Sequence, residues 1–339
     1  MKQVPTREAV GAVLCHDITK IVPGEFKGRA FKKGHIITEP DVAELLRLGK
    51  DHIFVWEQLE GMLHENEAAE RLAKAAAGKN ITWTEVNEGK VSLIASASGL
   101  LKVDRMLLEK VNSQDQVILS TRHSNILVQQ GELLAGTRVV PLVIEEEKIL
   151  AVEELCRDRA VVEVKPLRRF EVGLVTTGSE VYHGRITDAF SPVLKAKFAA
   201  LGSQVVDIVL VPDNMERITA AIQDLLARDV DMIAVSGGMS VDPDDLTPGA
   251  IQASGAEIIG YGAPVLPGSQ FLIGYFGEVP VVGLPGCVMY SKQTVFDLIL
   301  PRILAGEKIS KQDMISLAYG GLCLNCPQCN YPVCPFGKA

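Results

Sequence analysis

The second half of the chain alternates between apolar strand-like runs and helix-like runs, and this alternation constrains the fold more than any other feature. The segments alternate strand, helix, strand at 171–177, 187–202, 204–211, 214–229 and 230–237, and a last helix is expected at 288–304. Such a series is typical of β-α-β units, in which consecutive strands run parallel. We therefore predict an α/β fold here, a three-layer domain whose parallel-type sheet carries helices on both faces. Functional residues are expected where the strands end, because such sheets bind ligands at the carboxyl ends of their strands.

The first 167 residues lack this rhythm and mix short strands with helices. Strands are expected at 9–18, 34–38 and 53–56, and helices at 39–50 and 65–77. The second helix should end before Gly78, a residue type that commonly follows a helix terminus. The chain is therefore expected to contain a β-rich N-terminal segment (1–60), a mixed α/β domain whose role the sequence does not indicate (61–167), the α/β domain (168–308) and a cysteine-rich tail (309–339).

Charge and hydropathy exclude several classes of protein. The 34 Lys and Arg against 42 Asp and Glu give a net charge of −8, which disfavours nucleic acid and anionic membranes as partners. The sequence has no run of about 18 apolar residues that could span a membrane. Its first residues also lack the apolar segment of a signal peptide, so we expect a cytoplasmic protein.

The first candidate site is Thr176-Thr177-Gly178-Ser179-Glu180, which directly follows a predicted strand. Glycine lets backbone amides approach a ligand closely, and the N-terminus of a helix favours an anion. Gly184 and Asp188 follow before the next predicted helix. The alternative is a plain strand-to-helix turn in which Asp188 serves the first helical turn.

The second candidate site is the loop 236–247, SGGMSVDPDDLT, at another strand end. Two adjacent glycines beside a serine can form an anion-binding nest, and the three carboxylates within four residues could hold Mg²⁺. This pattern suits a phosphorylated ligand. The alternative is a polar turn in which Asp245 or Thr247 caps the next helix.

Two Pro-Gly pairs form the third candidate, Pro285-Gly286 and Pro267-Gly268. A Pro-Gly pair favours a tight turn that leaves the backbone open to a ligand. Cys287 could act as a nucleophile, although a lone cysteine near a helix start usually serves packing. Asp213 also follows a predicted strand, either as a site residue or as a helix cap.

Taken in order, these motifs resemble the molybdopterin-binding domain of molybdenum cofactor biosynthesis proteins. The matching stretches are TTGSE with the later Gly184 and Asp188, VPDN at 211–214, SGGMSVDPDDLT and the two Pro-Gly turns. The N-terminal AVGAVLCHDI with KKGHIITEPDVAELLRLGKDHIFVW is similar to the opening of the molybdopterin molybdenumtransferase branch. The resemblance covers about 170–305 well, 1–58 fairly, and the segment between them poorly.

The resemblance implies a domain that binds molybdopterin, usually adenylylated, and a transferase that inserts molybdate with release of AMP using Mg²⁺. It also implies a homodimer. The residues implied to act in the reaction are Glu180, Asp188, Asp213 and Asp245. Those implied to bind the pterin ligand are Thr177, Gly178, Ser179, Ser236, Gly237, Gly238, Ser240, Pro285 and Gly286, and Asp242 with Asp245 would hold Mg²⁺.

The chain departs from the family pattern after both Pro-Gly turns. Ser269-Gln270 stands where Lys-Pro is usual, and Cys287-Val288 where Asn-Pro is usual. No C-terminal β domain follows the last predicted helix either, only the cysteine-bearing tail. A second hypothesis is therefore a non-catalytic molybdopterin carrier or a redox-responsive regulator. A third is a molybdopterin adenylyltransferase, which shares the fold and consumes ATP.

Four of the seven cysteines crowd the tail, at positions 323, 326, 329 and 334. The run is close to the ferredoxin pattern C-x2-C-x2-C-x3-C-P, with one more residue before the last cysteine. An iron-sulfur cluster, a Zn²⁺ ion, or a redox-active tail without metal all remain open for Cys323, Cys326, Cys329 and Cys334. Such a tail could also dock a molybdoenzyme or a redox partner.

Overall fold

The computed structural model describes residues 2–22, 24–55 and 60–338, and the chain divides into two compact units. The first unit comprises residues 1–96, 104–122 and 131–163, and the second comprises 97–103, 123–130 and 164–339. Within the described ranges, none of the helices is both long and apolar enough to cross a membrane.

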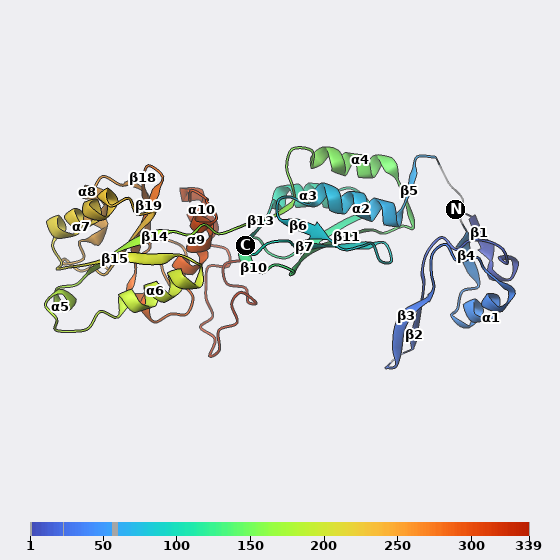
Figure 1. Cartoon of the computed structure of the whole chain (residues 1–339), viewed down its shortest axis with the longest axis horizontal. Coiled ribbons are helices and arrows are strands. Elements are labelled where there is room, and N and C mark those ends of the chain that lie inside the picture. The colour runs from blue at the N-terminus through green and yellow to red at the C-terminus, as the bar shows by residue number, and fades with distance from the viewer. Residues whose placement is uncertain (1, 23, 56–59, 339) are drawn as a thin grey trace. The chain divides into compact units, whose positions relative to one another are not determined.

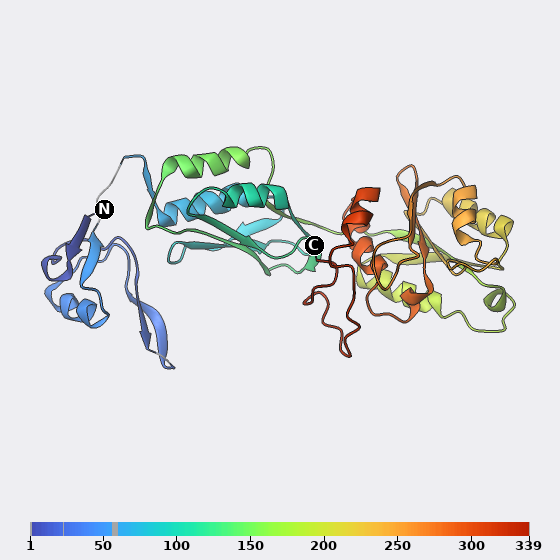
Figure 2. The same ribbon diagram turned by 180° about the vertical axis from the view of Figure 1, so that it is seen from behind.

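The first unit begins with small antiparallel pairs and continues as a sheet covered by helices. Its strands and helices are β1 (Lys2–Pro5), η1 (Thr6–Glu8), β2 (Ile18–Val22), β3 (Phe26–Phe31), α1 (Glu39–Arg47), β4 (His52–Val55), β5 (Met62–His64), α2 (Glu65–Ala76), β6 (Ile81–Trp83), β7 (Lys90–Ala95), α3 (Arg105–Asn112), β9 (Val117–Thr121), β11 (Leu133–Val139), β12 (Val143–Glu145) and α4 (Glu146–Leu155). Strands β6, β7, β11 and β9 form an antiparallel sheet in that order. Helices α2 and α3 pack on this sheet, and α4 packs against both helices on their other side (Figure 2).

The second unit contains the α/β domain expected from the alternating segments. Its elements are β14 (Glu171–Thr177), α5 (Ser179–Tyr182), α6 (Phe190–Ala200), β15 (Gln204–Val211), α7 (Met215–Ala227), β16 (Met232–Ser236), α8 (Thr247–Ala253), β17 (Glu257–Tyr261), β18 (Leu272–Phe276), β19 (Val279–Leu284), η2 (Gly286–Met289), α9 (Val295–Leu304) and α10 (Lys311–Ser316). The sheet order is β15-β14-β16-β19-β18-β17, and its first four strands are parallel (Figure 1). A further sheet, β10-β8-β13, comprises Ile126–Val128, Gly99–Val103 and Val162–Lys165.

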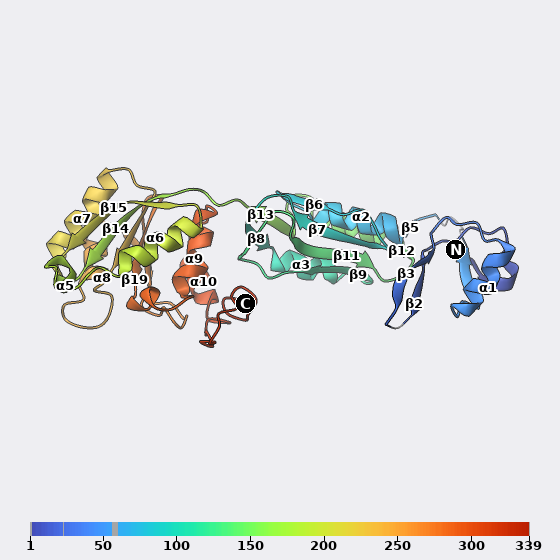
Figure 3. The same ribbon diagram turned by 60° about the horizontal axis from the view of Figure 1, so that its bottom comes forward.

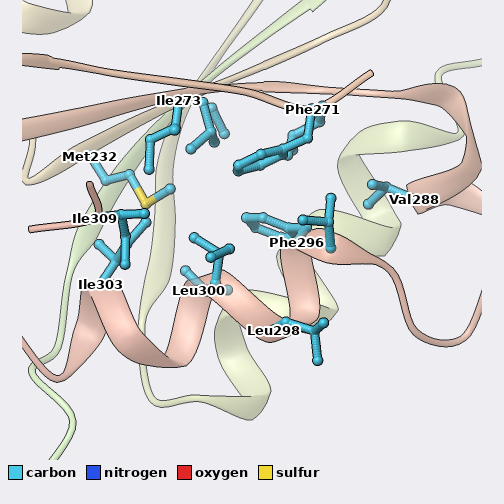
Figure 4. Packing of buried hydrophobic residues seen from close by; sticks show 14 of the residues in the cluster. Met232, Phe271, Ile273, Val288, Phe296, Leu298, Leu300, Ile303 and Ile309 are labelled. Atoms are coloured by element: carbon cyan, nitrogen blue, oxygen red, sulfur yellow. The ribbon is translucent and has the colours of Figure 1, made fainter. Parts of the chain in front are cut away.

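Alternate residues of the parallel strands point into two different cores. On β14, Val172 and Leu174 pack with α6, α9 and α10, whereas Val175 packs with α7 and α8. The two helix groups therefore cover opposite faces of the sheet, as Figure 3 shows. Figure 4 shows the first core, where Phe271 and Phe296 lie between the sheet and α9. The prediction of a sheet with helices on both faces is confirmed.

Several sequence-based expectations about individual elements are wrong. The strands expected at 9–18 and 34–38 are absent from these described segments except for single bridges at Val13, Leu14 and Ile36 and for Ile18, which begins β2. The helix expected at 288–304 begins only at Val295, because Thr294 and Asp297 form a capping box there. Trp56, at the end of the expected strand 53–56, lies outside the described residues. Strands β17 and β18 extend the parallel sheet in antiparallel fashion.

The cysteine-bearing tail belongs to the second unit and packs against its core. Phe336 is buried in the same core as α9, and Cys323 and Cys334 pack against that core. Leu322 forms a bridge with Leu266, the residue before the first Pro-Gly pair. The tail is therefore anchored to the α/β domain at two separate points.

Candidate functional site

The candidate site lies at the point where the strand order of the sheet reverses. From β14 the chain passes to β15 on one side and then to β16 on the other. In open α/β sheets this reversal leaves a crevice at the carboxyl ends of the two central strands, and ligands bind there. The residues that follow β14 and β16 are Gly178 and Gly237, both among those singled out from the sequence.

The glycine pair after β16 approaches the end of β14 so closely that no side chain fits. A Cβ on Gly237 would lie 2.2 Å from the carbonyl oxygen of Thr177 and 2.7 Å from its hydroxyl. Gly237 and Gly238 both have positive φ, 90° and 57°, which side-chain-bearing residues rarely adopt. The turn therefore requires glycine at both positions, and its backbone amides remain near the crevice.

Thr177 carries a polar group that its surroundings leave unsatisfied. Its side chain is 4% exposed, and its hydroxyl has no hydrogen-bond partner among the described residues. Buried hydroxyl groups in folded proteins normally have a partner, because leaving one without a partner costs about 1–3 kcal/mol. This hydroxyl faces the Gly237-Gly238 turn. The hydroxyl oxygen itself is buried, and Thr177 lines the cavity described below.

The rest of the loop after Gly238 is held by its own hydrogen bonds. The Thr247 hydroxyl donates to the carbonyl oxygen of Gly237 at 2.8 Å, and the Asp245 carboxylate accepts from the amide of Asp242 at 2.9 Å. The Tyr261 hydroxyl donates to the carbonyl oxygen of Met239 at 3.1 Å. Burial, together with the charge of Asp245, raises the pKa of Tyr261 above its ordinary value. These contacts fix the loop at the sheet edge.

These loops enclose a cavity of about 580 Å³. The expected site residues that line it are Thr177, Gly178, Glu180, Asp213, Gly237, Gly238, Asp242 and Asp245. Lining residues that the sequence interpretation did not assign to the site are Val181, Ile186, Thr187, Ala189, Phe190, Pro243 and Met289, whereas Asp244 was one of the three carboxylates expected to hold Mg²⁺. Most of these residues are apolar and carry no group that signals binding chemistry. Only their position in the loops after β14, β16 and β19 could have indicated them.

The remaining expected site residues do not line this cavity. Ser236 is fully buried, and its hydroxyl lies 3.3 Å from that of Thr176 in the sheet. Ser240 is exposed, Pro285 is buried and Gly286 is exposed at the start of η2. The Ser179 amide donates to the Asp213 carboxylate at 2.7 Å, which anchors the start of α5 to the loop after β15.

Asp188 forms the hydrogen bonds of a helix cap. Its carboxylate accepts from the amides of Phe190 and Ser191 at 2.8 and 3.1 Å, and it is also bonded to the Ser191 hydroxyl. This geometry matches the alternative interpretation of Asp188 at the start of the following helix.

Cys287 is the other residue for which the sequence left two interpretations, a nucleophile or a packing residue. It is half-buried, and burial raises the pKa of its thiol. A raised pKa disfavours the reactive thiolate, so the structure supports a packing role.

The charge of the lining is strongly negative. Glu180, Asp213, Asp242, Asp244 and Asp245 all contribute carboxylates, and among the residues described none of the lining is Lys, Arg or His. A phosphorylated ligand here needs a cation. Mg²⁺ fits this requirement, because it is commonly held by one or two carboxylates together with water and substrate phosphates. The described residues contain no group of three or more His, Cys, Asp or Glu side chains arranged to hold a metal ion by themselves.

Two family models match the chain, and they cover separate segments. Residues 173–305 match the probable molybdopterin binding domain, and residues 3–57 match a domain of unknown function. The first match begins in β14, ends at Ala305 directly after α9, and includes every loop that lines the cavity. The second unit therefore contains the segment that matches the family of probable molybdopterin binding domains. The resemblance expected from the ordered motifs is therefore confirmed over this segment.

Curated proteins that match the chain include molybdopterin molybdenumtransferases and also CinA-like proteins, one of which, from a Mycobacterium species (strain MCS), is 35% identical over 88 residues, covering 26% of this chain and 21% of that protein. The chain is 29% identical over 157 residues to a molybdopterin molybdenumtransferase of Haemophilus influenzae, covering 44% of this chain and 38% of that protein. It is 26% identical over 196 residues to one of Synechococcus elongatus, covering 54% and 46%. The chain thus spans less than half the length of both relatives. A solved structure of the molybdopterin biosynthesis enzyme MoaB from Thermus thermophilus matches at 21% identity and a TM-score of 0.35, covering 41% of this chain and 98% of that one.

Proposed function

We propose that the molybdopterin-binding domain binds adenylylated molybdopterin and Mg²⁺, and that the protein inserts molybdate with release of AMP. The observation that carries this proposal is the turn Gly237-Gly238 against the Thr177 hydroxyl, which combines close backbone approach with a polar group still lacking a partner in the described chain. The names of the curated relatives support the same chemistry.

In this proposal the glycine turn holds a phosphate of the ligand. Backbone amides of a turn with positive φ form a concave nest that suits an anion. The Thr177 hydroxyl would donate to a phosphate oxygen and so gain the partner it lacks within the described residues. Donors fixed in this way stabilise the charge that develops when the phosphoanhydride bond breaks, without rearranging during the reaction.

The carboxylates would position Mg²⁺ beside the phosphate. Glu180, Asp213, Asp242 and Asp245 surround the cavity, and each can accept hydrogen bonds from metal-bound water. Mg²⁺, when bound, offsets phosphate charge and polarises the bond that is cleaved. Asp213 is held by the Ser179 amide and Asp245 by the Asp242 amide, so both carboxylates are oriented before a ligand arrives. Orientation of this kind lowers the entropic cost of the reaction.

The test is AMP release by the full chain. Purified protein is incubated with adenylylated molybdopterin, Mg²⁺ and molybdate, and AMP is followed by chromatography. Glu180→Gln keeps the side-chain shape and removes the charge, and we expect it to lower the rate by about 10²-fold, the lower range of losses for electrostatic groups in active sites. The matched control is Asp224→Asn, a surface carboxylate on α7 paired with Arg228 outside the cavity, which should retain the rate.

A specific observation favours a second function, that of a non-catalytic carrier. The described lining of the cavity has no basic residue, so the chain offers no cation of its own to the leaving phosphate. Tight binding of the adenylylated ligand without AMP release would support the carrier and contradict the transferase. Consumption of ATP before molybdate is added would instead support the adenylyltransferase. A homodimer stays a prediction, which sedimentation of the purified protein would test.

A further inference from the structure

A second cavity of about 480 Å³ lies under the C-terminal tail, and all four tail cysteines line it. Its other walls are apolar and aromatic side chains of the tail, including Leu324, Tyr331 and Phe336, and the loop 290–293 that follows η2. The cavity belongs entirely to the second unit. It is separate from the molybdopterin pocket, with which it shares no lining residue.

The two outer cysteines are held in place by the fold. The Cys323 amide donates to the carbonyl oxygen of Leu266 at 2.8 Å, and the Leu266 amide donates to that of Gly321 at 2.8 Å. At the other end, Phe336 is 2% exposed in the core, directly after Cys334 and Pro335. Cys323 and Cys334 both pack against this core. Two thiols are thus presented to the cavity from fixed backbone.

The two inner cysteines lie on the irregular part of the tail. Residues 324–333, all described, contain neither helix nor strand. Cys326 is exposed and Cys329 is half-buried. No three cysteines of the described chain converge on one point, so a ligand in the cavity would have to draw Cys326 and Cys329 inward. The lack of regular backbone hydrogen bonding between the anchors permits this movement at low cost.

Thiolates gathered around an apolar cavity point to a soft metal rather than to oxygen-ligated ions. The spacing within the tail is C-x2-C-x2-C-x4-C followed by Pro335, and its first three cysteines have the spacing by which a linear ferredoxin run binds one cluster. Cys334 lines the same cavity and brings the thiols to the four that a cluster takes. Structural zinc sites instead tend to use two C-x2-C pairs with a long spacer between them. The cavity also far exceeds the space of one small ion, since a water molecule takes about 30 Å³.

We propose that Cys323, Cys326, Cys329 and Cys334 bind one iron-sulfur cluster in this cavity. On binding of a preassembled cluster, each thiol loses its proton and its sulfur forms one bond to iron in place of a thiolate of the donor, which leaves with that proton. The cluster keeps its oxidation state in this exchange, so the step needs no oxidant or reductant, and reconstitution from salts supplies ferrous and ferric iron together with sulfide. The site is independent of the proposed transferase activity, because its residues take no part in the pterin pocket.

The experiment is anaerobic purification of the full chain, followed by measurement of iron, acid-labile sulfide and visible absorption, before and after reconstitution with iron salts and sulfide. We expect iron and sulfide in equal amounts per chain. The double variant Cys326→Ser with Cys329→Ser should lose at least about tenfold of both, because two of four ligands are gone. Both positions lie outside helices and strands, so the variant should fold.

The matched control is Cys287→Ala, which removes another half-buried thiol of the same unit that does not line the cavity. It should keep full iron and sulfide, and circular dichroism of all variants confirms folding. Zinc in place of iron, or no iron and sulfide after reconstitution of folded protein, would overturn the proposal. Full iron in the folded double variant would do the same.

Discussion

At the residue scale, the Thr177 hydroxyl lowers the stability of the free protein but is proposed to contribute to ligand binding. Its buried hydroxyl finds no partner within the described ranges, so the free protein bears the cost of an unsatisfied polar group. A residue chosen for stability alone would be apolar at this position. Threonine at the end of β14, facing the Gly237-Gly238 turn, therefore fits the proposed ligand, which would give this hydroxyl a partner.

Replacement of this hydroxyl should move stability and binding in opposite directions. Thr177→Val has nearly the same shape and removes the unsatisfied group, so we expect the free energy of unfolding to rise by about 1 kcal/mol. Affinity for adenylylated molybdopterin should fall about tenfold, since one hydrogen bond to a charged group is lost. Urea unfolding and isothermal titration measure the two effects. Thr177→Ser, which keeps the hydroxyl, should bind normally, and a loss of affinity in that variant alone would contradict the argument.

Gly237 should tolerate no side chain. Gly237→Ala places a Cβ 2.2 Å from the Thr177 carbonyl oxygen at a φ of 90°, so the turn must open. We expect a loss of about 2–3 kcal/mol in unfolding free energy, within the range for strained backbone positions, together with loss of binding. The control is Gly260→Ala, because no described atom beyond its chain neighbours lies within 4 Å of that Cβ. Equal stability of the two variants in urea would show that the turn is not closely packed.

At the element scale, hydrophobic period and residue order are sufficient to predict the strand-helix series, but not where each element ends. The last helix was expected from Val288, but α9 begins only at Val295, where the reciprocal hydrogen bonds of Thr294 and Asp297 set its start. The segment 34–38 has the residue types of a strand, yet its backbone pairs with a loop at Leu14. Such outcomes depend on tertiary partners, which a local pattern does not contain.

The same limit applies to the site. Gly178, Gly237 and Gly238 were predictable, because a glycine directly after a buried strand commonly marks a tight turn or a close approach of two backbones. The functions of Asp188 and Asp213 were not, since a carboxylate beside a helix start can cap the helix, bind a ligand, or do both. The structure shows both residues bonded to backbone amides, and only Asp213 also lines the cavity.

An ionic network joins three elements of the second unit and should make its stability depend on acid pH. The Arg302 guanidinium on α9 contacts Glu307 at 2.8 Å and also Asp313 on α10, while Lys102 on β8 contacts Glu307 at 2.7 Å. Burial raises the pKa of Asp313, but hydrogen bonds from Arg302 and Ser310 outweigh it and hold this pKa at about 2, against an ordinary 3.8. The folded state therefore stabilises the ionised carboxylate of Asp313 more than the unfolded chain does.

Since the folded pKa of Asp313 is depressed, its contribution is complete above about pH 4 and disappears as the pH falls towards about 2. We expect the urea midpoint of the second unit to fall across this window. Asp313→Asn should have a lower midpoint at neutral pH and a shallower fall in acid. A variant with the same acid dependence as the natural protein would assign the effect to other carboxylates.

At the scale of the whole molecule, each unit has its own buried interior. In the first unit Leu72 of α2 is 2% exposed, and in the second Phe296 of α9 is fully buried. Chains built from separate cores often unfold in more than one step, and a ligand that binds one unit stabilises that unit alone. The cavity proposed to bind the pterin belongs to the second unit, which predicts which step should respond to the ligand.

We expect two calorimetric transitions, which core variants can assign. Leu72→Ala should lower only the transition of the first unit and Phe296→Leu only that of the second, the former by about 2–5 kcal/mol in unfolding free energy. Adenylylated molybdopterin with Mg²⁺ at about 100 times its dissociation constant adds about 2.7 kcal/mol to whichever unit binds it. The transition lowered by Phe296→Leu should then rise, and the other should stay. A rise confined to the Leu72→Ala transition would place the ligand in the first unit and contradict the assigned pocket.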